Sequence, residues 1–280
     1  MRVAIASGKG GTGKTTVATN LAWLAGQEEK SVVYLDCDVE EPNGQIFLKP
    51  VVTWRKQVTV PIPRVDPATC DLCGECGEIC QFSAIVCGGE KVLVFPELCH
   101  SCGGCSLVCS PTAITEVPRA IATLMGGEAG SVRYFQGLLD VGEAMSPPVI
   151  RAVKAEAPDA DLVIVDAPPG TSCPVVEAIK GSDHVLLVTE PTPFGLHDLE
   201  LALETVRTLE IPCEVVINRA GVNGSAAKAL CKRHGVEIIA EFPDDRSVAE
   251  AYSRGNLAAE VDGDFRHLYR ALLQHIEDLT

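Results

Sequence analysis

The chain has 280 residues, of which 46% are hydrophobic, and its formal net charge is −15 at pH 7. A chain of this length can bury one large core or two smaller ones. The acidic balance argues against non-specific nucleic-acid binding, because phosphate contacts need clustered Lys and Arg. No apolar run approaches the roughly 18 to 20 residues of a membrane span, and no signal-peptide pattern opens the sequence. We therefore expect a cytoplasmic protein that binds neither nucleic acid nor a membrane.

The first motif is a glycine-rich loop between an apolar run at residues 3–6 and a segment of helical spacing at residues 17–24. The order strand, glycine-rich loop, helix is that of a phosphate-binding loop, in which backbone N–H groups and the helix N-terminus hold phosphates. We expect Lys14 to reach the β- and γ-phosphates and the Thr15 hydroxyl to bind Mg²⁺. The predicted nucleotide-binding residues of the loop are Gly8, Lys9, Gly10, Gly11, Thr12, Gly13, Lys14, Thr15 and Thr16.

The string from Lys9 to Thr16 resembles the variant phosphate loop of the MinD/ParA/Mrp ATPases, which are related to the nitrogenase iron protein. The resemblance implies ATP or ADP with Mg²⁺ as ligands, ATP hydrolysis that can be slow without a partner, and a nucleotide-dependent homodimer. In that family the extra lysine reaches the nucleotide of the partner subunit. Lys9 would then stabilise charge in trans, as an arginine finger does. The alternative is a solvated surface lysine.

Acidic side chains end two apolar runs. The first run ends with Asp36 and Asp38, and the second, at residues 161–166, ends with Asp166. Such strand ends meet at one edge of an open parallel sheet. Asp166 is therefore expected to hold Mg²⁺, as the Walker-B acid does. Resemblance to the switch regions of the family implies that Asp38 orients water and Mg²⁺ and that the Gly170 N–H senses the γ-phosphate. The alternatives are acids that cap a helix and a simple proline turn.

Two later segments are predicted to contact adenine. A strand at residues 213–218 ends with Asn218, and an amide side chain both donates to and accepts from the N6/N7 edge of adenine. In the resembling family an Asn at this place contacts the base, whereas the alternative is an Asn that caps a turn. After a last strand at residues 237–242, Pro243 and Asp245 are expected to close over the adenine.

Eight of the 13 cysteines form a repeat. The spacing Cys-x2-Cys-x2-Cys-x3-Cys occurs twice with an offset of 29 residues, and the pair Ala84-Ile85 recurs as Ala113-Ile114. In a reducing compartment this spacing favours metal ligation over disulfides. Each repeat supplies three thiolates to one four-iron cluster and its fourth to the other. The predicted ligands are Cys70, Cys73, Cys76 and Cys109 for one [4Fe–4S] cluster, and Cys80, Cys99, Cys102 and Cys105 for the second.

The repeat resembles bacterial-type ferredoxins with two [4Fe–4S] clusters. It departs from them because neither Cys80 nor Cys109 is followed directly by the usual proline. Zinc is a minor alternative, since paired Cys-x2-Cys motifs also bind zinc. We expect Cys87 to lie in the core of a hairpin over residues 85–94, and Cys173 to be a small buried residue.

The chain order predicts an α/β fold: a three-layer P-loop NTPase with a mostly parallel sheet and an inserted small α+β ferredoxin-like module. Prolines among residues 51–64 indicate a boundary. The ATPase domain is assigned to residues 1–57 and 119–280, and the inserted module to residues 58–118. The helix predicted over 265–279 has no lysine, so core packing is favoured over membrane contact.

Three functions fit these motifs. The protein is an iron–sulfur ATPase that couples ATP and dimer state to electron transfer, an ATP-dependent factor that assembles or delivers a metallocluster, or a positioning ATPase with structural clusters. Two complete four-cysteine sites favour clusters that stay bound, and hence the first function. The protein partner is an unknown redox or cluster-accepting protein, for which a homologous ATPase is one candidate.

Overall fold

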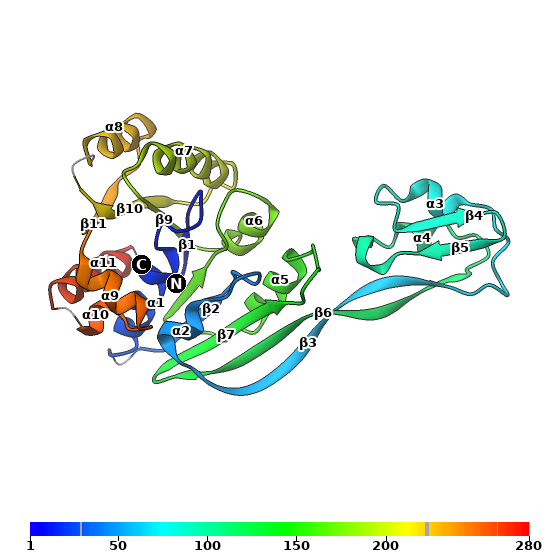
Figure 1. Cartoon of the computed structure of the whole chain (residues 1–280), viewed down its shortest axis with the longest axis horizontal. Coiled ribbons are helices and arrows are strands. Elements are labelled where there is room, and N and C mark those ends of the chain that lie inside the picture. Colours follow the sequence, from blue (N-terminus) through cyan, green and yellow to red (C-terminus); the bar gives the residue numbers. More distant parts are fainter. Residues whose placement is uncertain (29, 222–223, 262, 280) are drawn as a thin grey trace.

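Figure 1 shows the computed structural model, which describes residues 1–28, 30–221, 224–261 and 263–279. A large sheet covered by helices forms the body of the molecule, and a long two-stranded ribbon carries a small cysteine-rich module away from it (Figure 1). The order of the strands in the large sheet is β11-β10-β9-β1-β8-β2-β7-β6-β3. Neighbours from β11 to β7 are parallel, and β6 is antiparallel to both β7 and β3. The predicted mostly parallel α/β sheet is thus confirmed.

The strands of this sheet are β1 (Arg2–Ala6), β2 (Val32–Asp36), β3 (Val51–Val65), β6 (Ile114–Ala129), β7 (Val132–Leu139), β8 (Leu162–Asp166), β9 (His184–Thr189), β10 (Cys213–Ala220) and β11 (Ile238–Pro243). The helices of the body are α1 (Lys14–Ala25), α2 (Gly44–Leu48), α5 (Pro147–Ala155), α6 (Cys173–Ile179), α7 (Pro193–Thr208), α8 (Gly224–His234), α9 (Arg246–Ser253), α10 (Ala258–Val261) and α11 (Gly263–Asp278). Among the helices of the described residues, none has the length and apolar character that a membrane crossing needs.

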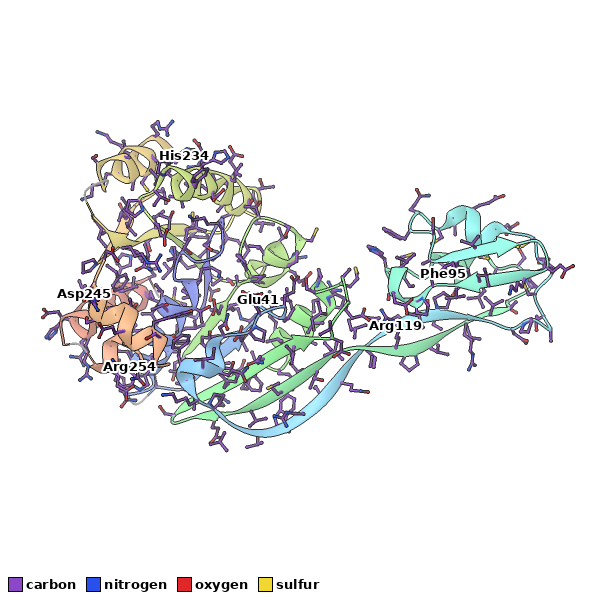
Figure 2. The ribbon with its side chains drawn as sticks, in the orientation of Figure 1. Glu41, Phe95, Arg119, His234, Asp245 and Arg254 are labelled. Carbon is purple, nitrogen blue, oxygen red and sulfur yellow. The ribbon has the colours of Figure 1, made fainter. Side chains whose placement is uncertain are left out.

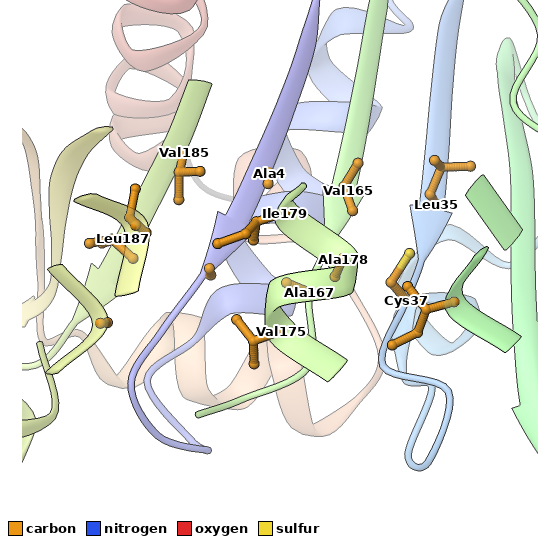
Figure 3. Packing of buried hydrophobic residues seen from close by; sticks show 14 of the residues in the cluster. Ala4, Leu35, Cys37, Val165, Ala167, Val175, Ala178, Ile179, Val185 and Leu187 are labelled. Atoms are coloured by element: carbon orange, nitrogen blue, oxygen red, sulfur yellow. The ribbon is translucent and has the colours of Figure 1, made fainter. Parts of the chain in front are cut away.

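The core lies on both faces of the sheet. Every residue of β2, β8 and β9 is buried, as expected for parallel strands that helices cover on two sides. One face packs against α5, α6, α7 and α8, and Figure 3 shows Ala4 and Val165 of the strands beside Val175 and Ile179 of α6. The other face packs against α1, α10 and α11. The helices therefore leave the carboxyl ends of the central strands available for a ligand.

The ribbon is formed by the outer halves of β3 and β6. Residues Ala122–Glu128 of β6 pair with both β3 and β7, whereas Ile114–Ala120 pair with β3 and with no other described strand. The prolines that indicate a boundary lie within this ribbon, and β3 continues through Pro61 and Pro63. An edge strand tolerates them because a missing N–H on its outer side costs no ladder hydrogen bond.

The cysteine module, residues 66–113, contains α3 (Glu75–Ile79), β4 (Ile85–Gly88), β5 (Lys91–Val94), the 3-10 helix η1 (Pro96–Leu98) and α4 (Gly104–Val108). The predicted hairpin is present as β4 and β5. The repeat of 29 residues is visible in the backbone, because the N–H of Phe95 donates to Ala84 at 2.7 Å and that of Asp66 donates to Ala113 at 2.8 Å. Residues with a positive backbone φ angle recur at the same offset of 29 residues: Leu72, Gly74 and Ser83 in the first repeat match Ser101, Gly103 and Thr112 in the second.

Candidate functional site

The glycine-rich loop joins β1 to α1 and requires glycine at two positions for steric reasons. A Cβ atom on Gly8 would lie 2.0 Å from the carbonyl oxygen of Asp198. Gly13 caps α1 in the left-handed region, with φ of 93°. A Cβ atom there would lie 2.2 Å from Nδ2 of Asn218, which itself donates to the carbonyl of Thr12 at 2.8 Å. The predicted base contact, Asn218, thus also supports the loop.

A cavity of about 350 Å³ lies at the carboxyl ends of the strands, directly against this loop. Its size falls in the range of small-molecule and cofactor pockets. The cavity brings together many residues that the sequence predicted for the nucleotide: Gly10, Gly11, Gly13, Lys14, Thr15, Thr16, Asp38, Asn218, Pro243 and Asp245. Other predicted residues lie outside its lining, namely Gly8, Lys9, Thr12, Asp166 and Gly170.

The sequence reasoning missed several residues of this cavity. Val248 and Tyr252 of α9 and Tyr269 of α11 give it an apolar wall. The helical pattern directly after the predicted adenine segment indicates α9, but it does not indicate which side chains reach the cavity. Asp245 has a second task there, because its carboxylate accepts from the N–H of Ser247 at 2.7 Å and caps α9. The cap fixes the apolar wall beside the predicted base site.

Two buried carboxylates stand next to each other at the ends of β2 and β8. Asp36 and Asp166 are fully buried and lie opposite each other in the strand register. Asp36 accepts from the N–H of Gly44 at 2.9 Å, and Asp166 accepts from the hydroxyl of Tyr34 at 2.8 Å. Burial raises the pKa of both carboxyls. Asp36 therefore has a supporting role at the start of α2.

The neighbouring groups suit a magnesium ion. One oxygen of Asp166, Oδ1, is buried and has no regular hydrogen-bond partner among the described residues. Lys14 and then the Thr15 hydroxyl oppose the rise in the pKa of this carboxyl. Burial raises the pKa of Asp38 to about 6, and Lys14 again opposes the rise. Two carboxylates and a hydroxyl form the set of oxygen ligands that Mg²⁺ prefers, so these residues fit the ion.

Lys9 and Gly170 make contacts within their own chain. The Lys9 ammonium lies 3.8 Å from the carboxylate of Glu190, which also pairs with Arg219. The N–H of Gly170 donates to the carbonyl of Ser7 at 2.9 Å. Lys9 belongs to the phosphate loop and Gly170 contacts its start, and each would have to leave its present partner to contact a nucleotide.

The eight repeated cysteines line two separate cavities of the cysteine module. The first cysteine site is lined by Cys70, Cys73, Cys76 and Cys109. The second cysteine site, with a cavity of about 220 Å³, is lined by Cys80, Cys99, Cys102 and Cys105. The cavities divide the cysteines into the two crossed sets that the spacing predicts. Within the described chain, no three His, Cys, Asp or Glu side chains converge on a single ion.

The thiols surround a space rather than a point, and a four-iron cluster needs this because each thiolate binds a different iron. Backbone N–H groups point at the sulfurs, with Ser101 at 3.4 Å from Cys99 and Ala113 at 3.2 Å from Cys109. Burial raises the pKa of the Cys80 thiol, but four nearby backbone N–H groups lower it further than that, so the net change is downward. Such donors stabilise thiolate ligands, and the sites therefore fit clusters.

Three other side chains refine the sequence-based picture. Cys173 was expected to be buried, but it is exposed because it is the first residue of α6 and points away from the core. Cys87 is half-buried on β4, with its thiol 3.6 Å from the carbonyl of Leu72. His100, in the loop of the second cysteine repeat, stacks on Phe82 with ring centroids 3.5 Å apart.

Comparison with known proteins agrees with this geometry. The model of the CobQ/CobB/MinD/ParA nucleotide-binding domain matches residues 3–258. The Methanocaldococcus jannaschii protein MJ0578 is 36% identical, over 99% of this chain and 98% of that protein. An iron-sulfur cluster carrier protein of the same organism is 23% identical, over 99% of this chain and 85% of its own.

Among solved structures, the septum site-determining protein MinD of Pyrococcus horikoshii, complexed with Mg-ADP, is similar with a TM-score of 0.63 and 19% identity. The match covers 99% of this chain and 96% of that one. At this identity the likeness establishes the fold, while the family match covers the loop, the acids and Asn218 together. The chain therefore belongs to the CobQ/CobB/MinD/ParA nucleotide-binding family and is a P-loop ATPase.

Proposed function

We propose that the protein is an iron–sulfur ATPase in which ATP and the dimer state control electron transfer through two [4Fe–4S] clusters. The observation that carries the proposal is the pair of cysteine sites, each lined by one crossed set of four thiols. These sites stand on a ribbon whose strands continue into the ATPase sheet. A bound four-iron cluster would supply one-electron chemistry.

At the nucleotide, the loop N–H groups and Lys14 bind the phosphates, and positioning with charge stabilisation drives hydrolysis. Thr15, Asp38 and Asp166 hold Mg²⁺, and Asp38 orients the attacking water. Asn218 and the wall that contains Pro243 contact the adenine. These roles are supported by the common cavity and by the unpartnered oxygen of Asp166.

A homodimer completes the proposed site. Lys9 is 30% exposed at its side chain and pairs with Glu190 at 3.8 Å, so it can exchange this partner for a phosphate of a second subunit. The division into an ATPase domain (1–57 and 119–280) and an inserted ferredoxin-like domain (58–118) belongs to the same proposal. The continuous strands β3 and β6 would then connect the two parts mechanically.

The test is an EPR-monitored redox titration of anaerobically purified protein, with and without Mg-ATP. We expect two cluster signals, and at least one potential that moves with nucleotide by tens of millivolts, since about 59 mV is a tenfold change in a one-electron equilibrium. Two potentials that are identical with and without Mg-ATP would contradict the proposal. Absence of any iron–sulfur signal would contradict it more strongly.

A second candidate is ATP-dependent delivery of a cluster. It is favoured by the relatives named iron-sulfur cluster carrier protein in Methanocaldococcus jannaschii and Pyrococcus horikoshii, and by the exposure of Cys73 and Cys102. Under this function, Mg-ATP would speed the transfer of iron and sulfide to an apo-ferredoxin acceptor. Under the first proposal, the clusters stay with the chain during repeated reduction and oxidation.

A further inference from the structure

The ribbon leaves the sheet at a β-bulge. The pairing of β3 with β6 shifts between Val58, opposite Ala122, and Thr59, opposite Ala120. Ile121 is the extra residue, and it is fully buried. Its carbonyl accepts from the N–H of Asp140 at 2.9 Å. Because a bulge bends its strand, the environment of Ile121 sets the direction in which the ribbon leaves the body.

Backbone hydrogen bonds connect this bulge to the segment that holds the catalytic acid. Val39 directly follows Asp38, and its carbonyl accepts from the N–H of Leu139 at 2.9 Å. The next residue, Asp140, is the one that donates to Ile121. A movement of the Asp38 segment therefore reaches the bulge through two consecutive residues at the end of β7.

An ion pair extends the connection to the ribbon. Arg119 lies two residues before Ile121 and forms a bidentate pair with Glu143, in which Nη2 and Oε2 are 2.7 Å apart. Their side chains are only 19% and 12% exposed. The N–H of Glu143 donates to the carbonyl of Asp140 at 3.1 Å, so Glu143 is tied to the same segment, residues 139–143. Figure 2 shows Arg119 on the ribbon, between the body and the cysteine module.

The second cysteine site is the one nearer to this ion pair. Arg119 pairs with Val60 across the ribbon, and the cavity of the second site is lined by the nearby Pro61 and Glu116. The first site instead contacts the far end of the ribbon, at Val65 and Ile114. Glu97 and the Cys99 thiol act electrostatically on Arg119. The charge of Arg119 therefore acts on the loop that carries the second site.

We infer that Arg119, held by Glu143, is a positioning residue through which the nucleotide state of the Asp38 segment sets the reduction potential at the second cysteine site. The inference rests on the proposed function for its cluster. Reduction by one electron from dithionite makes a cluster more negative by one charge, and a nearby cation favours that state. Withdrawal of the guanidinium lowers the potential of this cluster and leaves the other nearly unchanged.

The redox test compares wild-type protein with R119Q, E143Q and R119K, each reconstituted with iron and sulfide. In R119Q we expect one of the two potentials to fall by about 59 mV, a tenfold change in the one-electron equilibrium, with its response to Mg-ATP lost. E143Q removes the carboxylate that holds Arg119, so the response of the potential to Mg-ATP should be lost although the positive charge of Arg119 remains. R119K keeps the positive charge but cannot form the bidentate pair with Glu143. Its reduction potential should therefore stay close to that of the wild type, while the response of that potential to Mg-ATP is lost.

The matched control is K56Q. Lys56 pairs with Glu156 and also joins β3 to the body, but it lies outside the cavities of the cysteine module. It should leave both potentials and their nucleotide response as in the wild type. The inference is overturned if R119Q leaves both potentials unchanged, if it shifts both equally, or if K56Q has the same effect.

A second readout needs no cluster. Hydrogen–deuterium exchange of the full chain should show that Mg-ATP alters exchange at residues 114–119 in wild type and K56Q, but not in R119Q or E143Q. A nucleotide response of these residues in R119Q equal to that of wild type overturns the inference. If the wild-type potentials respond to Mg-ATP and R119Q keeps that response, the proposed electron-transfer function stands and the inference fails. If the wild-type potentials ignore Mg-ATP, the proposed function fails, and the redox part of the inference fails with it.

Discussion

The backbone N–H of Gly170 donates to the carbonyl oxygen of Ser7, with 2.9 Å between nitrogen and oxygen. Ser7 opens the phosphate loop, and Gly170 follows the strand that ends with Asp166. In this contact the N–H that is predicted to sense the γ-phosphate is occupied by the loop itself. Gly170 has φ of 100°, a conformation that L side chains rarely adopt. If the Gly170 N–H is to contact the γ-phosphate, ATP binding has to break the hydrogen bond to Ser7 and move the Gly170 segment.

Replacement of Gly170 by Ala is expected to lower the free energy of unfolding by about 1–3 kcal/mol, the usual cost of a strained backbone conformation. ATP hydrolysis should fall as well, because the segment no longer moves freely between Ser7 and the phosphate. Denaturant unfolding and steady-state hydrolysis measure the two effects. The control is Gly263→Ala, where no atom lies within 4 Å of the added Cβ. Equal effects of the two changes would contradict the assigned role.

Replacing each of the two lysines of the loop should have a different effect on nucleotide binding and hydrolysis. Lys14 is buried against the nucleotide cavity, so Lys14→Ala is expected to abolish nucleotide binding. Lys9 lies outside that lining, and Lys9→Ala should leave binding nearly unchanged. If Lys9 acts in trans, hydrolysis falls by about 10³-fold, the scale of a lost arginine finger. Calorimetric titration with ATP and light scattering of the dimer measure binding and assembly.

Glu190→Gln serves as the companion variant for Lys9. It removes the carboxylate that pairs with Lys9 at 3.8 Å in the single chain. Dimer formation should therefore become easier, while Arg219 also loses its partner. Arg219→Gln removes only the pair between Arg219 and Glu190. An effect that Glu190→Gln has and Arg219→Gln lacks therefore comes from the release of Lys9. Wild-type hydrolysis and assembly in Lys9→Ala would refute the role in trans.

The cysteine repeat predicts how the eight thiols of the module are grouped, whereas the prolines do not predict the ribbon. Cysteine spacing is a direct geometric constraint, and it assigned Cys109 to the set of Cys70 although the two are far apart in sequence. Pro61 and Pro63 indicate a boundary, but they do not predict that β3 runs through them as one strand of a long ribbon. The tertiary partner of Arg119, Glu143, leaves no local pattern at all.

Helix and strand patterns also predicted only part of the nucleotide site. Glycine, lysine and acidic residues with fixed spacing predict the phosphate end, because that chemistry is local to one loop and two strand ends. Tyr252 and Tyr269 reach the cavity from helices that any amphipathic pattern could form. Their place depends on how α9 and α11 pack, which a single sequence does not specify.

The crossed cysteine sets predict which variants share a phenotype. Cys109→Ser and Cys76→Ser should weaken the same EPR signal, and Cys80→Ser and Cys105→Ser the other. Iron should fall from about eight toward about four atoms per chain in each variant, since one of two four-iron clusters is lost. The control is Cys213→Ser, whose thiol is half-buried in β10, outside the module. Signals that pair Cys76 with Cys80 would contradict the crossing.

Stability should depend on pH through a buried histidine at the opposite end of the sheet. His184 and Glu214 are 6% and 9% exposed, with Nε2 and Oε2 at 3.0 Å, and His275 of α11 pairs with the same carboxylate at 2.8 Å. Burial lowers the pKa of His184, and Glu214 only partly opposes it. The folded chain therefore binds fewer protons here than the unfolded chain, in which histidine titrates near about 6.5.

As the pH falls through about 6.5, the unfolded state gains a proton that the folded state does not bind. The free energy of unfolding therefore decreases, by at most about 1.4 kcal/mol per pH unit. Asp38 contributes the opposite slope, because burial raises its pKa to about 6. The slope must therefore be compared between wild type and His184→Gln in denaturant unfolding between pH 7.5 and 5.5. A shallower decrease in His184→Gln is expected, and equal slopes would show that His184 is protonated in the folded chain.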